Sequence, residues 1–61
     1  MIDQDIWTLK AMKKFGGGFI KMLAQAAHHA DPENLQKIKN AWPEYWKKYE
    51  EIGRSIERSR E

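Results

Sequence analysis

The chain has 61 residues, no cysteine, and eleven Lys and Arg against nine Asp and Glu, giving a formal net charge of +2. A chain this short buries only about 60% of the surface that its unfolded form exposes, so it can form one small domain with a thin core. The lack of cysteine excludes disulfides and thiolate zinc sites, and the near balance of charge does not by itself indicate nucleic-acid binding.

The excess positive charge lies in the first half of the sequence. Residues 1–30 carry four lysines and two aspartates, whereas residues 31–61 carry seven charges of each sign. No apolar run approaches the roughly 20 residues needed to cross a bilayer, and no signal-peptide pattern is present. We therefore expect a cytoplasmic protein without a membrane segment.

Apolar residues recur at steps of three and four through the first half of the chain, which predicts a helix over about residues 4–29. This first stripe comprises Ile2, Ile6, Leu9, Met12, Phe19, Leu23 and Ala27. Gly16, Gly17 and Gly18 interrupt it, and each disfavours a helix interior by about 1 kcal/mol relative to alanine. Because the stripe keeps its direction across the glycines at about 100° per residue, we favour one bent helix. The glycines then serve either close packing, with Gly16 on the core face, or a hinge.

The same predicted helix carries two further faces. A second apolar strip comprises Trp7, Ala11, Phe15, Gly18 and Met22. A helix that is apolar over so much of its circumference must be covered on more than one side, so we expect a second molecule there, with Trp7 as its anchor; complete burial within the chain is the alternative. The remaining face is basic and comprises Lys10, Lys13, Lys14, Lys21 and His28. It is either a solvated face or a ridge that meets an acidic protein surface or phosphates.

The second half of the chain has clear helix boundaries. Asp31 suits an N-cap and Pro32 the first helical position, so a helix starts there. Seven residues then form a heptad series: Leu35, Ile38, Trp42, Tyr45, Tyr49, Ile52 and Ile56. Pro43 cuts across it, because a proline inside a helix removes a hydrogen bond and costs about 3 kcal/mol, so the helix either breaks or kinks between Asn40 and Trp42. We therefore predict a second helix over about residues 32–41 and a third over about 43–58, with Gly53 as a weak point.

Four large rings lie close together at positions 42, 45, 46 and 49. Trp42, Tyr45 and Tyr49 lie on the heptad seam and are predicted core residues, whereas Trp46 lies at its flank and is assigned to a partner surface. Stacking of exposed rings on bases, beside neighbouring lysines, is the alternative. The predicted partner-binding residues are Trp7, Phe15, Met22 and Trp46.

The sequence offers no catalytic set. The only serines, Ser55 and Ser59, lie near a charged tail, and the paired acids Glu50 and Glu51 are typical of a solvated face. Neighbouring histidines point about 100° apart on a helix, so His28 and His29 do not form a metal-binding pair and are expected to stabilise the helix C-terminus. We predict no enzymatic activity, no cofactor and no metal.

Two segments, AHHADPENL at residues 27–35 and AWPEYWKKY at residues 41–49, together with Ile38, resemble small helical proteins encoded by bacteriophages and other bacterial mobile elements. The resemblance spans roughly residues 15–53 and identifies no binding residue. Such proteins often act as stoichiometric inhibitors of host machinery, including CRISPR and other defence systems. The resemblance therefore implies an inhibitor or accessory factor that binds a host protein in the host cytoplasm.

These predictions combine into an all-α protein of two to three helices, in which a bent first helix packs against a second and third helix separated by Pro43. Residues 1–61 form a single small domain in this interpretation, completed by oligomerisation. The predicted function is non-catalytic protein binding. Two alternatives stay open: a small basic helical protein that binds nucleic acid, and an oligomeric sponge that sequesters a nucleotide signal between protomers.

Overall fold

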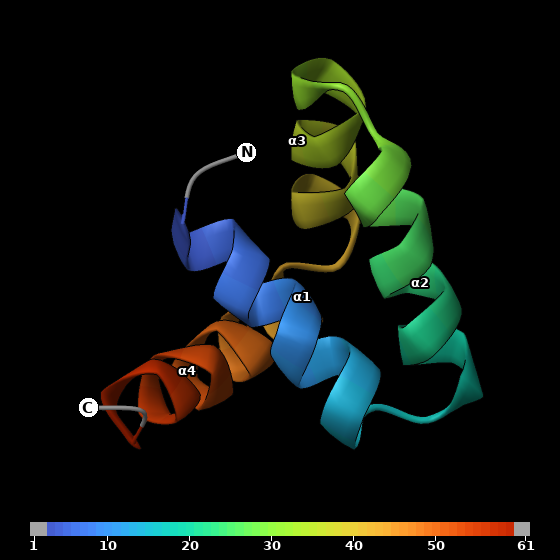
Figure 1. The fold of residues 1–61 in the computed structure, drawn as a ribbon. Helices are drawn as coiled ribbons and strands as arrows, with labels where there is room; N and C mark the ends of the chain where they lie inside the picture. The colour runs from blue at the N-terminus through green and yellow to red at the C-terminus, as the bar shows by residue number, and fades with distance from the viewer. Residues whose placement is uncertain (1–2, 60–61) are drawn as a thin grey trace.

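A computed structural model describes residues 3–59, which form four α-helices (Figure 1). They are α1 (Asp3–Phe15), α2 (Gly18–His29), α3 (Pro32–Ala41) and α4 (Pro43–Ser59). No strand occurs within the described residues, so the predicted all-α class is confirmed. The predicted number of two to three helices is wrong, because the first half of the chain folds as two helices. Ile2, assigned to the first apolar stripe, lies outside the described residues.

The glycine segment ends one helix and starts the next. The Gly16 N–H donates to the Met12 carbonyl at 2.9 Å, and the Lys21 N–H donates to the Gly17 carbonyl at 2.9 Å. Gly17, with φ −77° and ψ −170°, is the extended N-cap of α2. Gly16 is buried, and a Cβ added there would collide with the Ile20 side chain and the Met12 carbonyl. Because three glycines leave helix propensity weak, packing of α2 back onto α1 decides the backbone.

The boundaries predicted for the second half agree with α3 and α4. Asp31 is the N-cap of α3, and its carboxylate accepts a hydrogen bond from the Asn34 N–H at 2.7 Å. Trp42 ends α3 with φ −131° and ψ 62°, and α4 begins at Pro43. Pro43 thus separates two helices instead of kinking one.

Replacing Asp31 with alanine is expected to lower the free energy of unfolding by about 1 kcal/mol, because the Asn34 N–H loses its acceptor. Asp31→Asn keeps an acceptor oxygen at the same place and should retain most of the stability. Urea denaturation followed by circular dichroism measures the difference. Equal stabilities of the alanine and asparagine variants would show that the cap contributes nothing.

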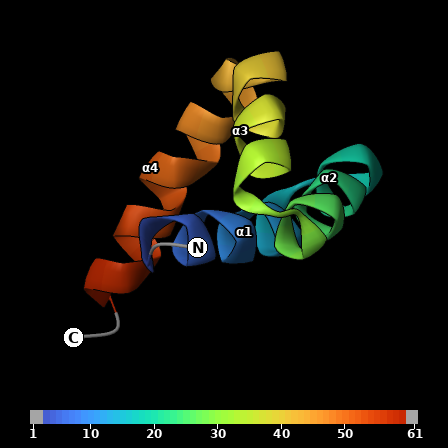
Figure 2. The ribbon, with the colours of Figure 1, turned by 90° about the horizontal axis from the view of Figure 1, so that it is seen from above.

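The four helices form a ring (Figures 1 and 2). α1 packs against α2, α2 against α3 and α3 against α4, and α4 closes the ring by packing against α1. The contact between α1 and α4 is the most extensive. Across the ring, the Cα atoms of α1 and α3, and those of α2 and α4, stay more than 8 Å apart. Side chains must therefore fill or bridge the space between opposite helices.

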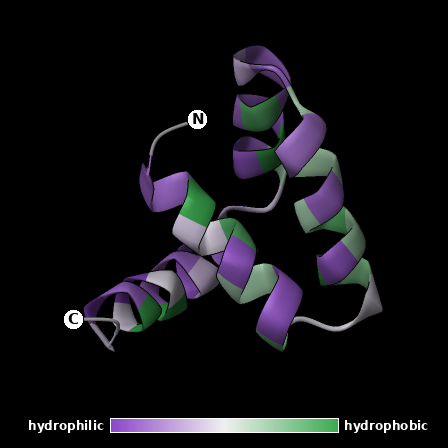
Figure 3. Cartoon of the chain, in the orientation of Figure 1, coloured by the Kyte–Doolittle hydropathy of each residue, from purple (hydrophilic) through white to green (hydrophobic). Residues whose placement is uncertain are grey.

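The core draws on all four helices, each of which alternates hydrophobic and hydrophilic positions along its length (Figure 3). Its ten buried apolar residues are Leu9, Ala11, Met12, Ile20, Leu23, Ala24, Ala27, Leu35, Trp46 and Tyr49. From the first predicted stripe, Ile6 and Phe19 are exposed instead. Trp42 and Tyr45, predicted as core residues, also keep about 40% of their surface exposed, at 38% and 41%.

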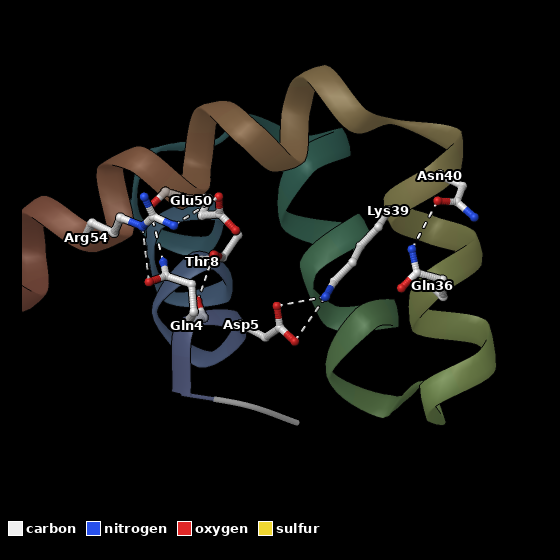
Figure 4. A network of polar contacts seen from close by, with 8 residues as sticks. All are labelled: Gln4, Asp5, Thr8, Gln36, Lys39, Asn40, Glu50 and Arg54. Atoms are coloured by element: carbon white, nitrogen blue, oxygen red, sulfur yellow. Dashed lines mark hydrogen bonds and ion pairs between the residues drawn. The ribbon is translucent and has the colours of Figure 1, made fainter.

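The close approach of α1 and α4 occurs at Gly53. A Cβ added to this residue would lie 2.8 Å from the Trp7 carbonyl carbon and 3.0 Å from the Thr8 amide nitrogen. Gly53 is buried, so in addition to being the predicted weak point of helix propensity it is a contact point between helices. Beside it, Gln4 donates from Nε2 to the Glu50 carbonyl at 3.3 Å (Figure 4).

An ion pair bridges the opposite helices α1 and α3. The Lys39 ammonium lies 3.0 Å from Oδ1 of Asp5 (Figure 4) and 5.3 Å from the centre of the Trp46 ring. The Asp5 side chain is only 6% exposed, whereas that of Lys39 is 25% exposed. Asp5 therefore does more than favour the start of α1: its charge is buried and depends on a lysine from a distant part of the sequence.

Candidate functional site

The structure disperses the four residues predicted to bind a partner. Phe15 and Met22 are strongly exposed, at 55% and 64%, and Trp7 is half-buried. Trp46 is only 7% exposed and belongs to the core, so its assignment to a partner surface is corrected. It lies on the buried face of α4, together with Tyr49 and Gly53.

The second apolar strip does not exist as one surface. The strip requires a continuous helix, whereas the break at Gly16 and Gly17 separates its members on α1 from Gly18 and Met22 on α2. Ala11, in the middle of the strip, is fully buried.

Phe19 is the centre of an exposed aromatic group that joins α2 to the start of α4. Its ring centre lies 5.7 Å from that of Trp42 and 6.3 Å from that of Tyr45, with both pairs edge to face. Met22 lies three residues after Phe19, on the same face of α2. We call these four residues, Phe19, Met22, Trp42 and Tyr45, the apolar surface. The sequence offered exposed rings as an alternative, but gave no sign that Phe19 would meet them.

The basic residues partly gather as predicted. Lys10, Lys13 and His28 line a groove of about 340 Å³ whose apolar residues are Ile6 and Leu9. We call these five residues the α1–α2 groove. Next to it, Lys13 and Lys21 line a more open hollow of about 290 Å³ with Met22 and Gln25. Lys14 lines neither, and its ammonium lies 5.4 Å from the centre of the Phe15 ring.

Little negative charge offsets this groove along α1 and α2. Their acidic residues are Asp3 and Asp5 in the first turn of α1, and Asp5 is paired with Lys39; residues 6–30 contain no Asp or Glu. The mixed charges of the chain lie on α3 and α4. The α1–α2 face therefore carries a positive potential that favours anions.

The burial of Trp46 also bears on the nucleic-acid alternative. Stacking on bases requires an accessible ring face, which Trp46 in the core does not offer. Lys10, Lys13 and Lys21 are fewer charges than the about 6 to 10 phosphate contacts typical of tight binding. The nucleic-acid alternative therefore retains exposed lysines but no longer has Trp46 to stack on bases.

Neither a membrane-spanning segment nor a metal cluster is found in residues 3–59. No helix there is long and apolar enough to cross a bilayer, and no three His, Asp or Glu side chains are grouped so as to hold a metal ion. Comparisons with protein-family models, curated proteins and solved structures give no match to this chain.

Proposed function

We propose that this chain is a non-catalytic protein-binding module whose contact surface is the apolar surface. The observation that supports this most directly is the group of three touching rings, of which Phe19 is 56%, Trp42 38% and Tyr45 41% exposed. Met22, at 64% exposed, extends the same surface along α2. Exposed apolar residues gathered in this way are typical of interaction sites, whereas single exposed ones are common on any protein.

The geometry of the rings favours binding for two reasons. Aromatic residues each bury about 150 to 250 Å² and dominate the binding energy of many interfaces. The rings are also held in place, because Phe19 contacts both Trp42 and Tyr45 before any partner arrives. Side chains that are ordered in the free protein lose less conformational entropy on binding.

The partner in this proposal is a protein of the bacterial host. The resemblance to small proteins of bacteriophages and mobile elements suggests an inhibitor or accessory factor that occludes a site on a larger protein, such as a component of a defence system. A second copy of the chain can cover the same surface, so self-association is part of the proposal. Both forms use the same four residues.

Replacing Phe19 with glutamine tests the proposal, since it removes both ring contacts from a side chain that is already 56% exposed. Affinity capture from the host lysate with the unmodified chain should recover one protein at near-stoichiometric yield. In a titration with that protein once purified, Phe19→Gln should weaken binding about 30-fold, equivalent to about 2 kcal/mol for an interface hot spot.

The matched control is Lys47→Gln, which changes an exposed residue of α4 outside the apolar surface. It should leave the affinity for the captured protein unchanged. Sedimentation equilibrium of the chain alone measures self-association. The proposal fails if the chain is monomeric and captures nothing, or if Phe19→Gln binds the captured protein as well as the unmodified chain does.

A further inference from the structure

We propose that the α1–α2 groove is a binding site for a small amphiphilic anion: a carboxylate or phosphate attached to a short acyl chain or a single ring. This site does not depend on the proposed protein partner. None of its five residues belongs to the apolar surface, and His28 lies at the other end of α2 from Phe19. The two sites adjoin at Lys13, which also lines the hollow that contains Met22.

The shape of the groove suits a small molecule with an apolar part. Its volume of about 340 Å³ falls at the lower end of ligand pockets, which span about 300 to 1,000 Å³. Ile6 is 40% exposed there, and Leu9 beneath it belongs to the buried core. A ligand chain lying on Ile6 and on the aliphatic stems of Lys10 and Lys13 would take apolar surface out of water, which inorganic ions cannot do.

The charges around the groove specify an anion. Lys10 and Lys13 lie three residues apart on α1, and His28 faces them from the last turn of α2. Within the described residues neither lysine forms an ion pair; the Lys10 ammonium lies 4.5 Å from the centre of the Trp7 ring. Both ammonium groups can therefore donate to a carboxylate or phosphate without giving up a carboxylate partner in the chain.

Either half of such a ligand alone would use only part of the site. A neutral apolar molecule leaves the two lysines unused, and a small anion such as acetate leaves Ile6 uncovered. The combination is specific because Ile6 and Leu9 are followed by Lys10 and Lys13 along one side of α1, which places apolar and cationic side chains next to each other. The same face is continued across the groove by His28.

Amide chemical shifts of the full chain, titrated with octanoate below its micelle concentration, test the inference. Octanoate should bind saturably with shifts centred on Ile6, Leu9 and His28, and at least 10-fold more tightly than either acetate or octanol. Octyl phosphate should shift the same amides, which would place the two head groups at one site. Shifts that do not saturate, or an equal response to octanol, would overturn the inference.

Two lysine variants and two controls test whether octanoate binds in the α1–α2 groove. Lys13→Gln and Lys10→Gln should each weaken octanoate binding about 5- to 10-fold, whereas Lys47→Gln, the same change of charge on α4, should have no effect. Phe19→Gln should also bind octanoate normally, which separates this site from the proposed protein interface. If octanoate shifts centre on Phe19, Trp42 and Tyr45, or if Lys47→Gln weakens binding as much as Lys13→Gln, the groove is not the site.

Discussion

Replacing Gly53 with alanine is expected to lower the free energy of unfolding by about 1 to 2 kcal/mol, although alanine is the better helix former. The added Cβ would lie 2.8 Å from the carbonyl carbon and oxygen of Trp7 and 3.0 Å from the Thr8 nitrogen. These are backbone atoms of α1 and cannot rotate away, so α1 and α4 must move apart. Their separation loosens the largest helix contact in the protein. That loss outweighs the about 1 kcal/mol gained in helix propensity.

Gly53→Val should be more damaging, at about 3 kcal/mol, because its two methyl groups enlarge the collision and a branched residue loses the propensity gain. A domain this small has a stability of only about 3 to 5 kcal/mol, so the valine variant should be largely unfolded near 37 °C. Thermal denaturation should show the alanine variant melting about 4 to 16 °C lower than the unmodified chain.

The matched control is Gly18→Ala, also a glycine in a helix. A Cβ at Gly18 would meet nothing within 4 Å, so this change should be neutral or stabilise the fold by up to about 1 kcal/mol. If the free energy of unfolding falls for Gly53→Ala and rises or stays unchanged for Gly18→Ala, then contact with α1, and not the flexibility of glycine, explains why position 53 requires glycine. A Gly53→Ala variant as stable as Gly18→Ala would contradict the close approach.

The second large effect is expected at Lys39. Lys39→Met should lower the free energy of unfolding by about 2 to 3 kcal/mol, because the carboxylate of Asp5 would stay buried with no cation beside it. Methionine is close to lysine in length and apolar, so the loss reports on the charge, including the contact of the ammonium with the Trp46 ring. Lys37→Met, on the exposed side of the same helix, is the matched control and should change stability by less than about 0.5 kcal/mol.

The two partners of this pair should not be equivalent. The Lys39 side chain is 25% exposed and can turn to water when its partner is lost, whereas Asp5, at 6%, cannot. Asp5→Asn is therefore expected to cost only about 1 kcal/mol, and adding Asp5→Asn to Lys39→Met should restore part of the lost stability. Urea denaturation of the unmodified chain, the two single variants and the double variant gives the four free energies of this double-mutant cycle. Equal losses for the two single variants would mean that the Asp5 carboxylate is not desolvated.

Both sites connect stability to the proposed functions. The contact at Gly53 holds α1 against α4, and the pair at Lys39 ties α1 to α3. Together they position α3 and α4, which meet at Trp42 and of which α4 carries Tyr45. The α1–α2 groove depends on the same position of α1 for Lys10 and Lys13. A stability measurement on each binding variant is therefore needed before its affinity is compared with that of the unmodified chain.

The error at the aromatic residues has a specific cause. The heptad series runs through Pro43 and predicts Trp42 and Tyr45 as core residues. In the structure the backbone at Trp42 leaves the helical region, and α4 starts anew at Pro43. Trp46 is buried in the first turns of α4 in place of Tyr45. Further along α4 the series holds, because Tyr49 is buried and Ile52 and Ile56 are half-buried and pack against the core.

Local sequence signals are sufficient to predict the all-α class, the start of α3 at Asp31 and Pro32, and an interruption of the helix at Pro43. The two boundaries depend on a cap and a proline ring, which act on backbone atoms within about four residues. The turn at Gly16 and Gly17, the contact of Gly53 with α1 and the contact of Phe19 with Trp42 instead depend on how the helices pack together. Each of these depends on where a second helix lies, and helical periodicity describes one helix at a time.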